Sequence, residues 1–401
     1  MQCELISTEL TRRMNIPHRL FVMLFMLLTT SVGAQLNTID RNVVTTAVPF
    51  LAISPDSRSG AMGDVGVATS ADANSIHWNP AKLAFLEDGA RSFALSYTPW
   101  LQQLVPDINL AYLSYAHQLD KNQAFAVDFR FFSLGEIQYT DQQGLDIGTY
   151  SSNEFALSGA YALKLSRNLS AGVALRYIYS NLTQAAGAQA IGQNITPGQS
   201  FASDVSLFYE GERFVMEGGQ TGRFLAGLNI SNLGTKIRYT ETTPSDFIPT
   251  NLRLGAGFIW GIDQYIDLGL HLEANKLMVP TPPLRDNEGN IIAGMENDVP
   301  FFQGVFQSFY DAPGGFTEEM QEVVINAGVE MWYDQKFALR AGYQHEAIDK
   351  GGRQYATLGL GLRFNVFGLD FSYLIPTTRV RNPLENTLRF TLFWNLHKAE
   401  S

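Results

Sequence analysis

The chain has 401 residues and a formal net charge of −11, and this acidic balance argues against nucleic acid as a partner. No run of 18 apolar residues follows the first 34 residues, so membrane-spanning helices are excluded there. Aromatic residues make up 12% of the chain and glycine occurs 35 times, a composition that suits both a transmembrane β-barrel and a secreted β-sandwich.

The first 34 residues have the features of an export signal. Three arginines precede an apolar run over residues 20–28, and small residues at positions 31–34 suit cleavage by a signal peptidase. We therefore expect residues 1–34 to be a cleaved signal peptide. The sequence leaves open whether Met1 or Met14 is the start.

The next distinctive stretch, residues 59–86, is rich in glycine, alanine, serine and aspartate. Such residues suit a backbone that folds tightly in a confined space, and Pro80 forces Asn79 toward an extended conformation, so a short helix over residues 71–76 should end there. A compact, turn-rich plug fits this description, whereas the alternative is an ordinary Gly-rich loop before a soluble β-domain. The residues that we expect to shape the plug are Gly60, Gly63, Asp64, Gly66, Asn79 and Pro80.

This stretch resembles the N-terminal hatch of the FadL-type outer-membrane barrels, in which a Gly/Ala-rich segment runs into an Asn-Pro-Ala turn before the first strand. Within that superfamily, residues 49–86 and the general plan of the chain look most like the PorV family, outer-membrane components of the type IX secretion system. The resemblance implies a periplasmic N-terminal segment and hatch over residues 35–90, followed by an outer-membrane barrel over residues 91–401.

The remainder of the chain alternates between apolar and polar residues in segments of about ten residues, the pattern of barrel strands. In one segment Phe125, Val127 and Phe129 occupy one face, while Asp128 and Arg130 occupy the other. The fourteen predicted strands cover residues 91–100, 108–119, 122–134, 153–166, 169–180, 200–210, 222–232, 250–260, 264–276, 321–333, 335–345, 353–365, 366–375 and 386–396.

The connections between these segments alternate in length. Short connections mostly follow even-numbered segments, as at residues 167–168 and at Asp334, and long ones mostly follow odd-numbered segments, as at residues 135–152 and 277–320. Outer-membrane barrels have short periplasmic turns, long outer loops and an even number of strands. The sequence therefore predicts an all-β fold, a fourteen-stranded antiparallel transmembrane β-barrel with an N-terminal Gly-rich hatch, located in the outer membrane.

In such a barrel the apolar rows face lipid and the polar rows face the lumen. Charges of both signs in the lumen can pair with one another, and with the hatch also inside we expect a plugged lumen. The charged residues predicted to point inward are Arg130, Arg176, Asp204, Arg253, Glu273, Glu330, Arg340 and Arg389.

We find no catalytic motif, and we expect no enzyme activity, no cofactor and no metal site. The only cysteine, Cys3, lies in the predicted signal peptide. His271 and Glu273 share one strand face, but a structural role is the better interpretation. Residues 286–290 carry oxygen ligands without the spacing of a calcium loop, and we interpret them as a solvated turn.

Two apolar segments lie in predicted outer loops, where exposed apolar patches bind partners or aggregate. In residues 301–310 the aromatic side chains recur at spacings that place them in one broad stripe on a helix. Packing back onto the barrel rim is the alternative to binding a partner, and the two are compatible. The predicted partner-binding residues are Trp100, Leu101, Leu104, Phe301, Phe302, Phe306, Phe309 and Tyr310.

The PorV resemblance implies a non-enzymatic role: receiving secreted cargo through its C-terminal signal domain as it leaves the secretion translocon, and presenting it to sortase-like attachment proteins. Outer-membrane lipid or lipopolysaccharide is the other expected partner. The first alternative is a FadL-type transporter of hydrophobic small molecules, which needs an apolar pocket and a kinked strand, whereas the predicted lumen is charged. The second is an outer-membrane lipid deacylase with a Ser/His pair.

Overall fold

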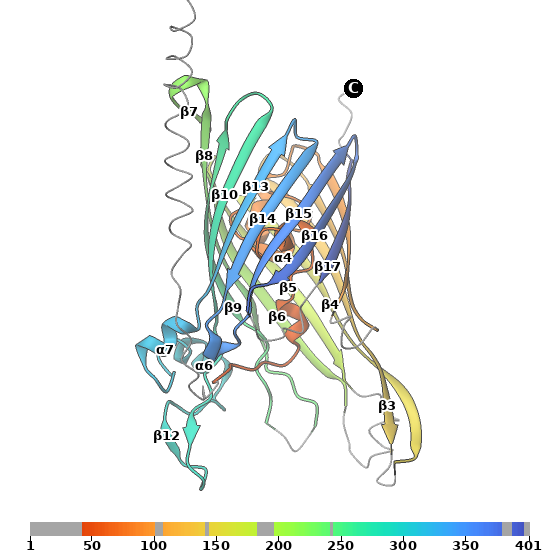
Figure 1. Cartoon of the computed structure of the whole chain (residues 1–401), viewed down its shortest axis with the longest axis vertical. Helices are drawn as coiled ribbons and strands as arrows, with labels where there is room; N and C mark the ends of the chain where they lie inside the picture. Colours follow the sequence, from red (N-terminus) through yellow and green to blue (C-terminus); the bar gives the residue numbers. More distant parts are fainter. Residues whose placement is uncertain are drawn as a thin grey trace, which may run out of the picture. The chain divides into compact units, whose positions relative to one another are not determined.

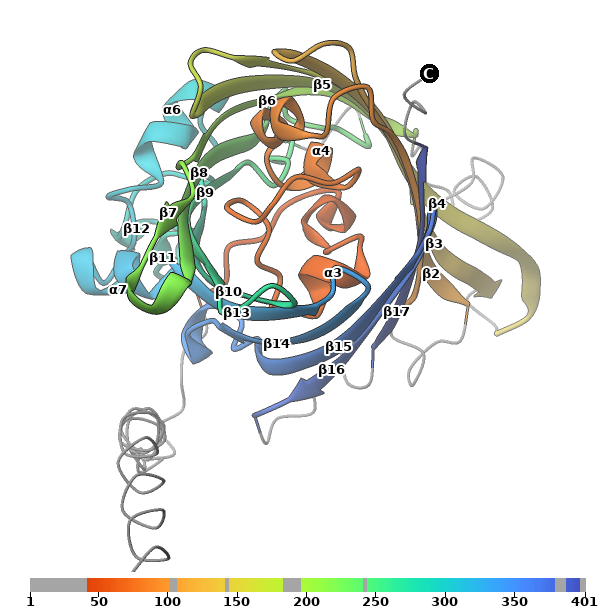
Figure 2. The same cartoon turned by 90° about the horizontal axis from the view of Figure 1, so that it is seen from above.

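The computed structural model of the protein describes residues 42–100, 107–140, 144–182, 196–240, 244–378 and 387–396. Within these residues, fourteen long antiparallel strands form one sheet that closes on itself (Figures 1 and 2), because β1 pairs with β17 and β6 pairs with β8. The long strands are β1 (Arg91–Pro99), β2 (Ile108–Gln118), β3 (Gln123–Thr140), β4 (Asp146–Lys164), β5 (Leu169–Asn181), β6 (Gly198–Glu210), β8 (Thr221–Gly234), β9 (Asn251–Gly261), β10 (Ile266–Leu277), β13 (Val324–Tyr333), β14 (Phe337–His345), β15 (Gln354–Phe364), β16 (Phe367–Pro376) and β17 (Leu388–Leu396).

The remaining elements are short. The segment at residues 42–90, which we call the hatch, contains η1 (Pro49–Ala52), α3 (Ser57–Gly60), α4 (Ser75–Trp78) and η2 (Pro80–Phe85). The connections between strands contain β7 (Phe214–Val215), η3 (Glu217–Gly219), β11 (Leu284–Arg285), β12 (Ile291–Ala293), α6 (Phe301–Gln307), α7 (Phe316–Gln321) and η4 (Ile348–Lys350). No described helix is long and apolar enough to cross a membrane.

The predicted all-β, fourteen-stranded antiparallel fold is confirmed, and each predicted segment corresponds to one long strand. One region differs: residues 135–152 were expected to form a loop, but β3 and β4 continue to pair as far as Thr140 and Asp146. A register shift between Ser133 and Glu136, where Gly135 has a φ of +80°, separates this hairpin extension from the barrel. The sequence prediction missed this extension because glycines and polar residues interrupt the alternation at residues 133–136 and 144–149.

The two faces of the sheet follow the alternation of each strand. In β1 the side chains of Phe93, Leu95 and Tyr97 are exposed on the outside, whereas Ala94 and the serines between them are buried. Apolar side chains that face outward along every strand suit contact with hydrocarbon. All eight charged residues predicted to point inward are buried in the structure.

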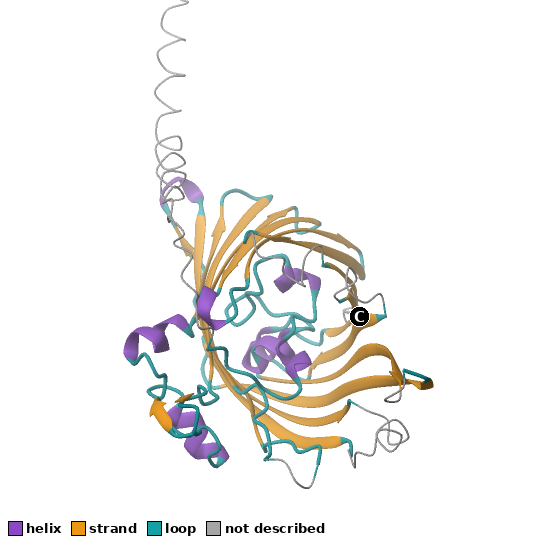
Figure 3. Cartoon of the chain, turned by 60° about the horizontal axis from the view of Figure 1, so that its bottom comes forward, coloured by secondary structure: helices purple, strands orange, loops and turns teal. Residues whose placement is uncertain are grey.

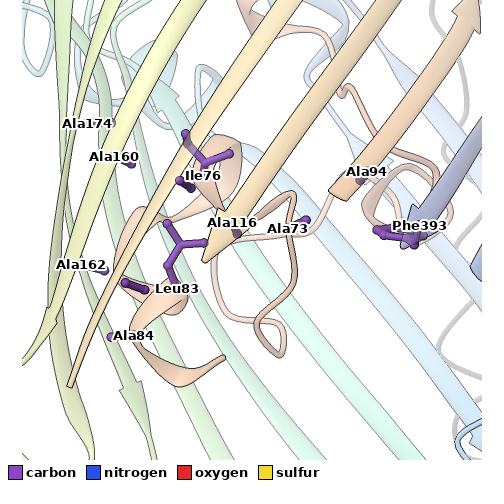
Figure 4. Close-up of a cluster of buried hydrophobic side chains, with 12 residues drawn as sticks. Ala73, Ile76, Leu83, Ala84, Ala94, Ala116, Ala160, Ala162, Ala174 and Phe393 are labelled. Carbon is purple, nitrogen blue, oxygen red and sulfur yellow. The ribbon is translucent and has the colours of Figure 1, made fainter. Parts of the chain in front are cut away.

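The hatch lies inside the ring of strands, as the view along the barrel shows (Figure 2). Its apolar side chains Ile76 and Leu83 pack mainly against alanines of the wall (Figure 4). Hatch and wall therefore share one buried apolar cluster. The wall residues of this cluster are Ala94, Ala116, Ala124, Ala126, Ala160, Ala162, Ala174 and Phe393. Small side chains along one sector of the wall therefore make room for the hatch backbone.

The two ends of the barrel differ. At one end, which we call the turn end, strands are joined by tight turns, and Asp334, Gln335 and Asn365 take the positive φ values of about +51° that such turns need. The other end, the loop end, carries α6, α7, β11, β12 and the β3–β4 extension (Figures 1 and 3). Outer-membrane barrels place their longer loops outside the cell, so we expect the loop end to face outward.

Peptide tags test this orientation. Tags inserted at Gly144 and Gly289, and at Gly187, which lies outside the described residues, should be labelled by an impermeant reagent on intact cells. Tags at Asn168 and Asp334, in the short turns, should be labelled only after the outer membrane is permeabilised. Labelling of Asn168 or Asp334 tags on intact cells would show that the orientation is wrong.

Candidate functional site

The hatch backbone is bound by polar side chains of the wall. The carboxylate of Glu273 accepts hydrogen bonds from Gly66 N at 2.8 Å and from Val67 N at 2.9 Å, while a ring nitrogen of His271 lies 3.1 Å from Ala68 O. These contacts assign a structural role to the His271–Glu273 pair. Further hatch contacts come from Thr357 to Gly63 N, from Asn326 to Asp64 O and from Asn229 to Trp78 O.

The predicted plug glycines occupy tight positions. Gly63 has a φ of +69°, and a Cβ atom there would lie 2.6 Å from Tyr343 N. A Cβ atom on Gly66 would overlap the Trp78 ring, and one on Gly60 would lie 2.5 Å from a guanidinium nitrogen of Arg389. Each position therefore needs glycine for a different reason, either backbone conformation or lack of space.

Of the other three predicted plug residues, Asn79 and Pro80 shape the chain after α4, and Asp64 contacts the wall. Asn79 is extended, with φ −163° and ψ 97°, and its side chain accepts from Ala81 N and donates to Val67 O and Leu207 O. Pro80 begins η2 directly after it. Asp64 accepts a hydrogen bond of 2.6 Å from the Tyr355 hydroxyl of the wall.

The wall is shaped to match the hatch. A Cβ atom on Gly172 would lie 2.6 Å from Pro80 C, and one on Gly342 would lie 2.6 Å from Met62 Cα, whereas Gly359 faces Ala61. Strand residues that lack a side chain thus allow the hatch backbone to touch the sheet directly.

Ion pairs join α3 to the wall inside the barrel. Arg58 of the hatch binds Glu330 of β13 through two nitrogens, at 2.9 and 2.8 Å, and also contacts Asp72. Glu330 binds Arg340, which in turn binds Asp370 at 3.1 Å. Because these charges are buried and mutually paired, loss of one member leaves another unpaired in the lumen.

Substitution of the tight glycines tests the hatch. Gly66→Val should loosen the hatch and cost about 1–3 kcal/mol, because the new side chain collides with Trp78, and Gly63→Val should do the same through backbone strain. The measurements are heat stability of the purified barrel and permeability of cells to large antibiotics. Gly159→Val is the matched control, since no atom lies within 4 Å of a Cβ at Gly159. Wild-type heat stability, permeability and secretion in both hatch variants would contradict the role of residues 42–90 as a plug.

The predicted aromatic stripe at residues 301–310 does not form one face in the structure: one side chain packs inward and the others are exposed. Helix α6 ends at Gln307, so Phe309 and Tyr310 lie beyond it. Phe301 packs against the buried cluster of Phe247, Val279 and Val299 at the loop end. The side chains exposed to solvent are Phe302 at 73%, Phe306 at 68%, Tyr310 at 63% and Phe309 at 43%.

Helix α7 carries two further exposed apolar side chains at the loop end, Phe316 and Met320, which are 79% and 53% exposed and which the sequence analysis missed. The acidic residues between them hid a short amphipathic pattern. We call Phe302, Phe306, Tyr310, Phe316 and Met320 the aromatic surface. Of the second predicted segment, Trp100 packs partly against the cluster around Phe50 and Ile108. Leu101 and Leu104 lie outside the described residues.

Buried ion pairs fix α7 to the rim of the barrel. Lys350 contacts Glu318 at 2.5 Å and Glu322 at 2.9 Å, and Lys276 at the end of β10 contacts Glu322 at 2.6 Å and Glu319 at 2.9 Å. Both lysines are less than a tenth exposed. We infer that these five residues, which we call the lysine clamp, hold α7 with Phe316 and Met320 in one position relative to the strands.

Removal of one lysine tests this clamp. Lys350→Met leaves Glu318 and Glu322 without one of their cations, so we expect a cost of about 3 kcal/mol and faster proteolysis within residues 277–323. Lys336→Met is the control, because Lys336 forms an exposed pair with Asp334 at the turn end. Equal proteolysis rates for both variants and the parent would contradict the clamp.

No metal-binding constellation was found among the described residues: none of them forms a group of three or more His, Cys, Asp or Glu side chains suited to a metal ion. Asp286 instead accepts hydrogen bonds from the backbone of Glu288 and Asn290 within its own exposed turn. The ring nitrogens of His77, His117 and His271 contact Arg130, Ala90 O and Ala68 O respectively, and none of these partners is a serine.

The fold and the filled lumen define a plugged β-barrel of the outer-membrane class. The family described as type IX secretion system protein PorV matches residues 36–284, which is more than half of the chain. The chain therefore belongs to the PorV family, and it is an outer-membrane component of type IX secretion.

Solved structures with similar barrels share little sequence with the chain. The Pseudomonas putida toluene transporter TodX is 13% identical, with 86% of this chain and 99% of that chain covered and a TM-score of 0.49. The Ralstonia pickettii toluene transporter TbuX is 11% identical, with 85% and 98% covered and a TM-score of 0.42. A Pseudomonas aeruginosa FadL homologue is 12% identical, with 88% and 99% covered and a TM-score of 0.39. No curated protein sequence gave a significant match.

Proposed function

We propose that this protein receives secreted cargo at the aromatic surface and passes it to the attachment machinery at the cell surface. The observation that carries the proposal is the exposed row of Phe302, Phe306 and Tyr310 at the loop end. The neighbouring Phe301 packs against Phe247, Val279 and Val299, which anchors the start of α6. Large apolar side chains on a fixed support are the usual anchors of protein interfaces. The C-terminal signal domain of the cargo is the partner that membership of the family favours.

Passing the cargo on requires that the surface also be reachable by other proteins. The aromatic surface lies on α6 and α7, outside the ring of strands (Figure 2), so a partner can approach it without entering the barrel. We propose the secretion translocon and sortase-like attachment proteins as the partners before and after cargo capture. Lipid or lipopolysaccharide of the outer membrane would contact the apolar outer rows of the strands.

Transport of hydrophobic small molecules through the barrel is less well supported. Such a path needs an apolar passage, whereas Arg58 of the hatch forms a buried charged network with Glu330 and Arg340 of the wall. The hatch is also bound on several sides by wall residues such as Glu273 and Asn229. A deacylase role has no observation in its favour, and we propose a non-enzymatic function.

Cargo capture by the aromatic surface can be tested directly. Phe302→Ser combined with Phe306→Ser should weaken surface attachment of a cargo that carries its C-terminal signal domain by at least tenfold, because interface anchors typically contribute about 2 kcal/mol each. The barrel should still insert and resist heat like the parent, since both side chains are exposed. A second double variant, Phe306→Ser with Phe309→Ser, should also weaken cargo attachment.

The control is Phe364→Ser, which removes an equally exposed phenylalanine, 76% accessible, from the turn end. Wild-type cargo attachment in the Phe302/Phe306 variant would refute the proposed role of the aromatic surface. Loss of the barrel itself would show instead that the aromatic side chains serve the packing of the loop.

A further inference from the structure

A small cavity lies between the hatch and the sector of the wall formed by β5, β8 and β9. Its volume of about 10 Å³ is enough for one occupant the size of a water molecule. His77 and Leu51 line it from the hatch, and Arg176 and Arg253 line it from the wall. None of the residues that line it is acidic.

The first donor at this cavity is His77, whose side chain is buried. Arg130 Nη2 lies 2.7 Å from His77 Nδ1, and a guanidinium can only donate, so Nδ1 accepts and the ring proton is on Nε2. Burial, together with the nearby charge of Arg130, holds the pKa of His77 well below its usual value, so the ring is neutral. Among the described residues, His77 Nε2 has no hydrogen-bond acceptor.

The second donor is Arg253 on β9, also buried. Its guanidinium stacks over the Trp78 ring at 4.7 Å, and its Nε likewise has no acceptor among the described residues. Glu273 is 3.7 Å from Arg253 Nη1, which is too far for a hydrogen bond, and its other oxygen already accepts from Gly66 and Val67. Two N–H groups without acceptors thus belong to residues that line the same cavity.

The third cation, Arg176, is compensated by other partners. It binds Asp204 at 3.0 Å and Ser158 at 3.0 Å, and it also contacts Asn232. It therefore does not need the occupant as an acceptor. An unpaired buried donor is costly, so a group that accepts two hydrogen bonds would be stabilised here.

We propose that this cavity binds a single small anion, chloride, between His77 Nε2–H and Arg253 Nε–H. Chloride accepts hydrogen bonds and donates none, which suits two buried N–H groups that lack acceptors among the described residues. The bound anion would connect the hatch to the wall, since His77 belongs to the hatch and Arg253 to β9. This assignment goes beyond the proposed role in cargo capture and does not depend on it.

Bromide provides the direct test, because it replaces chloride and can be located by its anomalous scattering. Crystals of the full purified protein grown with bromide should show an anomalous peak in the cavity, within hydrogen-bond distance of both His77 and Arg253. In solution, chloride should raise the Tm of the detergent-purified protein in a saturable way when it replaces gluconate at constant ionic strength. A cavity without anomalous signal, together with a Tm that is the same in both salts, would show that it holds water only and would overturn the proposal.

Variants connect the effect to the site. Arg253→Met removes one donor while keeping an apolar stem, and it should abolish the chloride dependence of Tm. Arg223→Met is the matched control: Arg223 also lies on the wall with a buried Nε that lacks an acceptor among the described residues, but it does not line the cavity. Equal chloride dependence in both variants would overturn the site. If Arg253→Met does not insert, the bromide peak in the parent protein decides the question.

Discussion

The structure depends on a polar backbone being packed directly against the inside of a sheet. The hatch contains only short helical turns, so part of its backbone N–H and C=O groups must find partners outside these turns. The wall supplies these partners through Glu273, Asn229, Asn326 and Thr357. Glycines such as Gly172 and Gly342 bring the two backbones close enough for those bonds to form. A polar lumen is thus required by the hatch.

Because of this constraint, the interior of the barrel and its loop end serve different purposes. The interior is filled by backbone contacts and buried ion pairs, so it is organised for holding the hatch in place. The aromatic surface is at the loop end, where Lys276 and Lys350 fix α7 to the rim. In a member of the PorV family, this arrangement supports a role exercised from the outside of the barrel.

Local features could be predicted from the sequence, because they depend on neighbouring residues. The alternation in residues 122–134 and 264–276 located β3 and β10, and Asn79-Pro80 located the end of α4. Contacts between distant residues could not be predicted. That Glu330 meets Arg58, or that Lys350 meets Glu318, depends on how the sheet closes and on where the hatch lies within it. Phe316 and Met320 were missed because glutamates separate them in the sequence.

The central claim, that the barrel works with its hatch in place, can be tested by locking the hatch to the wall. Ser57 of α3 and Thr391 of β17 are suited to this, since their hydroxyl oxygens lie 3.1 Å apart. Ser57→Cys combined with Thr391→Cys should form a disulfide under oxidising conditions, and cargo should still be secreted and attached at the wild-type rate. Secretion that stops when this disulfide forms and resumes when it is reduced would contradict the account, because it would mean that the hatch must move.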